Sequence, residues 1–315
     1  LTIDGPVILS KLTLNDTVTV TPENYLMLTD TLQLNGKIVL QANATHTAQL
    51  LDNGITGNGR LEVEIYTTAG DWHFMCPPVH NLETNLKLNN LWYYDETRIN
   101  NDWDQGWVKI TNLNVLNQKP IMQGYDHRTY VYLNSWCGTP NTGDYSITVT
   151  HTDNAEIEAH EGWNLVGNPY PSTLDWDKVE KIGIDPTLNI WNKNQYSSYV
   201  DGVGVNGGSR YIAPNQGFFV KVLQPNDTGE VRVDNNMRVL TASRFKSGVK
   251  RPTVKLKIDN GWSEDEIALK FQSQATDTFD VGLDALKKFG SDFITQLYTS
   301  DTKTKYSINS LPTFE

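Results

Sequence analysis

The chain is poor in cysteine and in alanine. Only two cysteines, Cys76 and Cys137, occur in 315 residues. They lack the close spacing and the histidine partners of a zinc site, so one Cys76–Cys137 disulfide or two free thiols remain as interpretations. Alanine occurs eleven times, against thirty Asn and thirty-three Thr. Because Thr favours strands and Asn favours turns, this balance predicts an all-β protein.

Excess positive charge and long apolar runs are absent as well. The net charge is −11 and the pI is about 5.0, which argues against a nucleic-acid partner because phosphate backbones are bound by basic surfaces. No run of about 18 apolar residues occurs, so we expect no transmembrane segment. The chain opens at Leu1 within a strand pattern and without a signal peptide, and we expect a mature or trimmed fragment.

Residues 1–69 carry short apolar alternations. Val18 with Val20 and Leu32 with Leu34 are two examples, and Asn, Asp and Gly separate such pairs. This pattern predicts many short strands joined by tight turns. We expect β-solenoid-like rungs, with a sandwich edge and a plain antiparallel meander as open alternatives.

The same sequence features occur in the same order in residues 70–160 and again in residues 161–240. Each segment has a Trp strand that ends at proline (GDWHFMCPP and GWNLVGNPYP), an aromatic strand (LWYYDE and LNIWNKN), an aromatic loop, and a Pro–Gln–Gly segment before a last aromatic strand. Trp163 follows Trp72 by 91 residues, and Gly217 follows Gly124 by 93. The spacing predicts two related β-sandwich or jelly-roll units.

A third module is expected at the C-terminus. Residues 240–249 are polar and basic, which is typical of a linker. In residues 250–315, VKLKID and EIALKF alternate as strands around a hairpin loop, and residues 281–290 have helical spacing. We interpret this part as a partial β-sandwich module that is cut short at Glu315.

Catalytic and metal-binding patterns are not found. The six histidines form no HExxH pair, and no GxSxG elbow occurs. Asp102 with Asp104, and Asp175 with Asp177, are close in sequence, but such acids are typical of solvated loops. We therefore expect a non-enzymatic protein without a cofactor. A structural calcium ion at Asp102 and Asp104, or in the loop 259–266, is left open.

Aromatic loops are the feature with binding chemistry. Trp103 and Trp107 in one unit, and Tyr196 and Tyr199 in the other, lie between polar residues. Flat rings in such loops stack on sugars or on protein partners, so these four are the candidate ligand-binding residues. Packing within the core is the alternative.

The segments GWNLVGNPYPSTLDW and IAPNQGFFVKV, with WHFMCPPV before them, resemble large exported proteins of Bacteroidetes-type bacteria that use the type IX secretion system. This resemblance implies an extracellular or outer-membrane surface location. It also implies a secretion-machinery partner reached through a sorting domain, which is not visible before Glu315. Cys76 stands where that family has a small polar residue, so the disulfide has no support from it.

The resemblance does not predict an activity, because proteins of this architecture have many different functions. With no catalytic pattern found, we expect a scaffold or adhesion protein whose partners are glycans or surface proteins. The alternative is a carbohydrate-binding region of a polysaccharide-active secreted enzyme.

Overall fold

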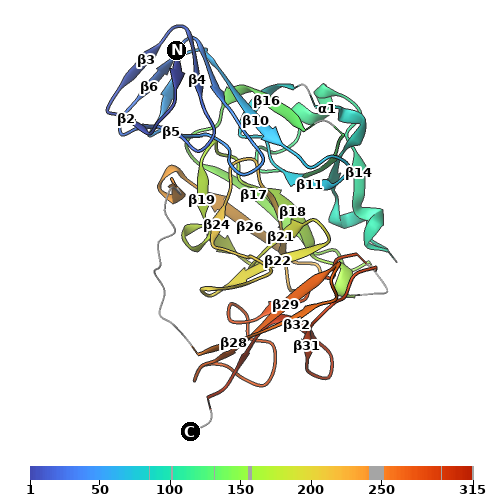
Figure 1. Cartoon of the computed structure of the whole chain (residues 1–315). Helices are drawn as coiled ribbons and strands as arrows, with labels where there is room; N and C mark the ends of the chain where they lie inside the picture. The colour runs from blue at the N-terminus through green and yellow to red at the C-terminus, as the bar shows by residue number, and fades with distance from the viewer. Residues whose placement is uncertain are drawn as a thin grey trace.

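The computed structural model shows an all-β protein, as predicted, and describes residues 1–84, 86–100, 102–130, 132–154, 158–240, 252–291 and 293–313. Within these ranges the one α-helix is α1 (Leu113–Asn117). Short 3₁₀ helices join the strands: η1 (Leu88–Asn90), η2 (Glu96–Arg98), η3 (Trp103–Gly106), η4 (Glu158–His160), η5 (Trp176–Lys178) and η6 (Asn235–Met237). The N-terminal strands and the C-terminal sheet lie at opposite ends of the molecule (Figure 1).

The first nine strands pair only in parallel, with strands three positions away in the chain order. They are β1 (Thr2–Ile3), β2 (Val7–Leu9), β3 (Leu12–Leu14), β4 (Thr17–Val20), β5 (Tyr25–Leu28), β6 (Leu32–Leu34), β7 (Lys37–Leu40), β8 (Gln49–Leu51) and β9 (Ile55–Thr56). Their pairs form three sheets, β1-β4-β7, β2-β5-β8 and β3-β6-β9. An antiparallel meander, one alternative for this region, is therefore not formed.

The next seven strands build a β-sandwich. They are β10 (Arg60–Tyr66), β11 (Trp72–Met75), β12 (Val79–Thr84), β13 (Leu91–Tyr94), β14 (Trp107–Lys109), β15 (Tyr125–Arg128) and β16 (Leu133–Pro140). One sheet has the order β10-β16-β12 and the other β11-β15-β13-β14. Strand β10 also pairs in parallel with β7, so the first sheet continues into the N-terminal turns.

A second sandwich follows. Its strands are β17 (Tyr145–Thr150), β18 (Trp163–Gly167), β19 (Thr173–Asp175), β20 (Glu180–Ile182), β21 (Asp185–Asn192), β22 (Gln195–Val200), β23 (Val203–Val205), β24 (Tyr211–Ile212), β25 (Gly217–Lys221), β26 (Thr228–Val233) and β27 (Arg238–Val239). The sheets are β17-β26-β20 and β18-β25-β21-β22-β23, with a small third sheet β24-β19-β27.

The two sandwiches have the same strand order, as the predicted duplication requires. The sheet β10-β16-β12 corresponds to β17-β26-β20, and β11-β15-β13-β14 corresponds to β18-β25-β21-β22. Every one of these pairs is antiparallel. In this correspondence the repeated strands start with β10 at Arg60 and again with β17 at Tyr145.

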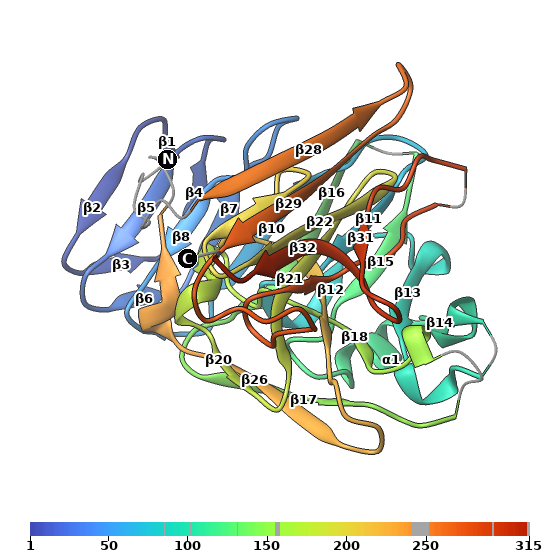
Figure 2. The same cartoon turned by 90° about the horizontal axis from the view of Figure 1, so that it is seen from below.

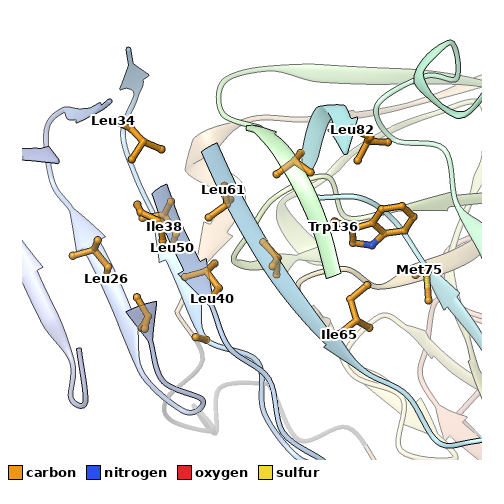
Figure 3. Close-up of a cluster of buried hydrophobic side chains, with 14 of the residues drawn as sticks. Leu26, Leu34, Ile38, Leu40, Leu50, Leu61, Ile65, Met75, Leu82 and Trp136 are labelled. Carbon is orange, nitrogen blue, oxygen red and sulfur yellow. The ribbon is translucent and has the colours of Figure 1, made fainter. Parts of the chain in front are cut away.

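A continuous apolar core joins the N-terminal turns to the first sandwich. Leu26, Ile38 and Leu61 are fully buried, and Trp136 on β16 belongs to the same cluster. Figure 3 shows these side chains in one row that runs from the N-terminal strands to Trp136. Burial of apolar side chains stabilises each by roughly 1.5–3 kcal/mol, so the turns are held mainly by this shared core.

The two sandwiches meet through one sheet of each. Phe74, Tyr94, Ile99, Trp163, Leu165, Tyr196 and Phe219, with Trp107 and Trp191 packed against them, form what we call the aromatic cluster. Next to the aromatic cluster, two isolated β-bridges cross between the repeats: Met75 pairs with Gln216, and Val166 pairs with Gln123. These two bridges join equivalent positions of the repeat in opposite directions, so the units are related by an approximate two-fold axis.

The C-terminal module is a single five-stranded sheet. Its strands are β28 (Thr253–Asp259), β29 (Glu264–Phe271), β30 (Ala285–Leu286), β31 (Thr299–Ser300) and β32 (Lys305–Leu311). One face packs on β22 and β23 through Val200, Val205, Ala268 and Ile308, and Figure 2 shows the sheet lying across the second sandwich. The helical spacing of residues 281–290 does not produce a helix; β30 lies there instead.

Candidate functional site

Two of the four predicted ligand-binding aromatics lie together, but inside the molecule. Trp107 and Tyr196 both belong to the aromatic cluster, where Trp107 packs edge-on against Tyr94 with ring centroids 5.0 Å apart. Tyr196 is 7% exposed. Both residues lie in strands, the partly buried Trp107 at the start of β14 and Tyr196 in β22. Their rings pack at the junction of the two sandwiches and do not form an exposed stacking surface.

The remaining two predicted aromatics are separate. Tyr199 is buried in the second sandwich, and its hydroxyl donates to the Asp177 carboxylate, 3.0 Å from Oδ2. Burial, followed by the charge of Asp177, raises the pKa of Tyr199. Trp103 begins η3, but its side chain lies outside the described part of the chain.

Of the two interpretations of the cysteines, the structure has the second: Cys76 and Cys137 are both free thiols. Cys76 is buried at the junction of the two repeats, where its Sγ lies 3.5 Å from the Ile121 carbonyl oxygen. Cys137 lies in β16, opposite Glu62 and Glu83 on the neighbouring strands. Cys76 follows the end of β11 and Cys137 lies in β16, and burial raises the pKa of each.

The acidic pairs have local structural partners. Asp102 caps η3 by accepting from the Asp104 amide at 3.1 Å, and Asp175 caps η5 in the same way. Asp175 also forms an ion pair with Arg210. Among the described residues no three His, Cys, Asp or Glu side chains gather as a metal site, and the calcium ion stays a prediction.

A cleft opens where the N-terminal turns, the first sandwich and the second sandwich meet. Its volume is about 340 Å³, which lies at the lower end of the range, about 300–1,000 Å³, of small-ligand pockets. We call it the polar cleft. It is lined by Asn43, Ala44, Thr45, His46, Thr47, Gln49, Ile65, Tyr66, Thr67, His73, Phe74, Met75, Thr173, Ala213, Pro214, Asn215 and Gln216.

Asn215 is the unusual residue of the polar cleft. Its side chain is 5% exposed, and neither Oδ1 nor Nδ2 has a hydrogen-bond partner among the described residues. A buried amide without partners costs roughly 1–3 kcal/mol. Its backbone has φ of 63°, a conformation that Asn tolerates but that glycine adopts without burying an amide. The turn therefore explains why the residue is small, but not why it is polar.

The equivalent position in the other repeat shows that this turn does not require a polar side chain. The Cys76 amide donates to the Asn215 carbonyl at 2.8 Å, and the Gly167 amide donates to the Met122 carbonyl at 3.0 Å. Asn215 and Met122 are thus equivalent. Met122 is fully buried in the core of the second sandwich, so one copy of this position completes a core and the other carries an unpartnered amide beside a cleft.

Exposed aromatic rings stand at one edge of the polar cleft. Tyr66, which lines the cleft, stacks on Tyr132 with centroids 5.9 Å apart and planes at 29°. Tyr132 is 55% exposed, and Tyr130, two residues earlier, is 72% exposed. We call Tyr66, Tyr130 and Tyr132, with the neighbouring Trp72, the aromatic rim.

Backbone hydrogen bonds hold the aromatic rim in place. The Thr67 amide donates to the Tyr132 carbonyl at 2.9 Å, and the Gly70 amide donates to the Thr129 carbonyl at 2.8 Å. Arg128 donates from Nε to the Gly70 carbonyl at 2.6 Å and lies over the Trp72 ring. The rim is therefore a supported edge of the first sandwich, where β10 ends and β16 begins.

Two titratable side chains with strongly shifted pKa values lie close by on β15. Burial raises the pKa of Asp126 to about 8. Burial, with a smaller effect from His73, lowers the pKa of His127 to about 4. His73 lines the polar cleft and lies opposite His127 in the sheet, whereas Asp126 lies opposite Phe74.

The sequence predicted neither the polar cleft nor the aromatic rim. The signal for the rim is present in RTYVYLN (128–134), where two tyrosines stand at alternate positions and so share one face of an extended segment. The cleft has no local signal, because its walls come from residues 43–49, 65–75, 173 and 213–216.

One comparison with known proteins gave a match. A family model described as a domain of unknown function (DUF8693) matches residues 6–315. No curated protein and no solved structure matches the chain. In the described ranges, no helix has the length and apolar character needed to cross a membrane.

Proposed function

The chain belongs to the family described as a domain of unknown function (DUF8693), so we propose its function from its own site: it is a non-enzymatic, exported adhesion protein that binds a glycan in the polar cleft. The export and surface location rest on the resemblance of GWNLVGNPYPSTLDW and IAPNQGFFVKV to type IX secretion cargo. The glycan rests on the cleft and the aromatic rim.

The observation that carries the proposal is the unpartnered Asn215 amide on the wall of a cleft with stacked tyrosines at its edge. Side-chain amides and aromatic rings are the groups that fix and stack flat polar ligands. Both amide atoms are shielded from solvent, so contact requires a rotamer change in the cleft wall. Such changes commonly accompany binding.

A non-enzymatic role fits the chemistry of the lining. Eight of the seventeen cleft residues are Thr, Asn or Gln, and two more are His46 and His73. His46 lies 3.2 Å from the Glu23 carboxylate, and His73 Nε2 lies 3.1 Å from the Thr68 amide. Both rings are thus engaged in local contacts. Glycoside hydrolysis uses two facing carboxylates, and the lining supplies none.

The experiment is a glycan-array screen of the chain, followed by calorimetry with the best ligand. Asn215→Gly keeps the left-handed turn and removes the amide, and the double variant Tyr66→Ala/Tyr132→Ala removes the stacked pair. Each is expected to weaken binding at least tenfold. Trp262→Ala is the matched control, because Trp262 is 68% exposed but lies in the C-terminal module.

Two results would contradict the proposal. The first is the absence of any glycan signal at high protein concentration. The second is a glycan affinity that Trp262→Ala lowers while Asn215→Gly and the tyrosine variant leave it unchanged, since binding would then lie elsewhere.

A further inference from the structure

The lining of the polar cleft carries little charge. No Lys, Arg, Asp or Glu is among the described residues that form it. Glu23 and Glu64 stand nearby, but Glu23 pairs with His46 and Glu64 accepts the Ala42 amide at 3.0 Å. The chain as a whole has a net charge of −11. An anionic sugar would find no cation in the cleft and a repulsive field around it.

The low charge of the cleft is a first condition on the ligand, and the Asn215 amide sets a second. A side-chain amide presents one acceptor oxygen and one donor NH₂ on the same edge. Two adjacent hydroxyls of a sugar ring match it, because one hydroxyl donates to Oδ1 while the oxygen of the next accepts from Nδ2. A carboxylate only accepts, so it would leave Oδ1 unpaired at a cost of roughly 1–3 kcal/mol.

An acetamido group matches less well. Its peptide-like amide is planar and trans, so its N–H and its C=O point in opposite directions. A single side-chain amide therefore pairs with one of the two groups and leaves its own other atom unsatisfied. The amide of Asn215 thus favours a hydroxyl pair over an N-acetyl group.

The aromatic rim sets the third condition. Tyr66 lines the same cleft as Asn215 and stacks on Tyr132, so a ring surface leads from the cleft to the rim. Aromatic faces pair with apolar C–H surfaces, which an uncharged sugar ring presents. A ligand longer than one sugar therefore reaches from the cleft onto the rim.

From these three conditions, and resting on the proposed function, we infer that the polar cleft binds a neutral hexose of an oligosaccharide through two adjacent hydroxyls on Asn215, with the next sugar stacked on Tyr66 and Tyr132. Acidic and N-acetylated sugars are discriminated against, the former by charge and the latter because the acetamido group takes the place of one hydroxyl of a pair.

The test measures binding of three sets of soluble oligosaccharides of equal length by calorimetry: neutral hexoses of several linkages, N-acetylglucosamine oligomers and uronic-acid oligomers. The best neutral hexose is expected to bind at least tenfold more tightly than either other set. Asn215→Gly is expected to lower that affinity at least tenfold and to bring the three sets close together. Thermal unfolding of Asn215→Gly confirms that the variant is folded.

Deoxy analogues of the best ligand sharpen the assignment. Removing either hydroxyl of the pair is expected to weaken binding to the natural chain but to change little in Asn215→Gly, because the partner is already gone. Tighter binding of uronic-acid or N-acetylated oligomers would overturn this inference and leave the proposed function standing. Failure of all three sets, and of the array, would overturn both.

Discussion

Gln123 and Gln216 make the same hydrogen bonds in opposite directions across the junction of the two sandwiches. Gln123 donates from Nε2 to the Leu165 carbonyl at 3.1 Å, and Gln216 donates from Nε2 to the Phe74 carbonyl at 3.0 Å. Each also donates to the glycine that follows it, at 3.1 and 2.8 Å. The repeated Gln–Gly pair therefore encodes the contact between the repeats.

Replacing these glutamines tests that contact. Gln123→Ala and Gln216→Ala are each expected to lower the free energy of unfolding by about 1–2 kcal/mol, because the carbonyl partners lose their donor. Urea unfolding followed by tryptophan fluorescence measures the change. Gln33→Ala is the control, since Gln33 is an exposed strand residue. Equal stability of all three variants would show that the glutamines do not hold the junction.

The pH dependence of stability is expected to reflect Asp126. Its pKa is raised by burial to about 8, whereas an unfolded aspartate titrates near 4. The folded state thus keeps a proton that the unfolded state releases, so this contribution falls as pH rises from about 4 to 8. His127, with its pKa lowered to about 4, acts in the opposite direction between about 4 and 6.5.

The two contributions nearly cancel below about pH 6.5, and Asp126 acts alone of the pair above it. We expect the stability difference between the natural chain and Asp126→Asn to shift by about 2 kcal/mol against the natural chain between pH 6.5 and 8. Urea unfolding at several pH values measures this difference. A difference that stays constant with pH would show that Asp126 is ionised in the folded protein.

Arg238 is expected to be the side chain whose loss most weakens the attachment of the N-terminal turns. It pairs with Asp52 at 2.8 Å, both side chains being fully buried, and donates to the Leu50 carbonyl at 2.8 Å and to Ser172 at 2.8 Å. Arg238→Ala leaves the Asp52 charge buried without a cation, at a cost of about 3–5 kcal/mol.

Thermal unfolding measures the effect of Arg238→Ala. Its matched control is Arg232→Ala, whose ion pairs with Glu180 and Glu230 are about half exposed on the arginine side and contribute about 0–1 kcal/mol. Similar losses for the two variants would contradict the role given to Arg238.

Thiol chemistry checks the two free cysteines. In the folded protein a thiol reagent is expected to modify Cys137, which is partly exposed, and to leave the buried Cys76 unreacted. Because the pKa of Cys137 is raised, its reaction quickens as the solution becomes alkaline. Unfolding should expose the second thiol, and Cys137→Ser should abolish the reaction of the folded chain. Mass spectrometry that finds no thiol after unfolding would instead establish a disulfide.

The repeat was predictable because its signals are local. Trp72 and Trp163 mark equivalent strands, and the Gln–Gly pairs mark the last strand of one sheet in each unit. The burial of the predicted aromatic residues was not predictable. The alternating pattern shows which residues lie on the same face of the strand as Tyr196, but it does not show what covers that face. The other repeat covers it.

The cleft was not predictable for a related reason. Asn215 has the left-handed backbone conformation of a turn residue, which a sequence pattern of Pro, Asn, Gln and Gly is enough to explain. Its lack of partners depends on residues more than 100 positions away, such as those of the loop 43–49. No pattern within a single strand or loop carries that information.

Strand β10 has a mechanical consequence. It is bound in parallel to β7 on one side and antiparallel to β16 on the other. The N-terminal turns and the first sandwich therefore share one continuous sheet through β10. The turns cannot separate from the sandwich without breaking the β7–β10 ladder and parting the fully buried Ile38 and Leu61 on those strands.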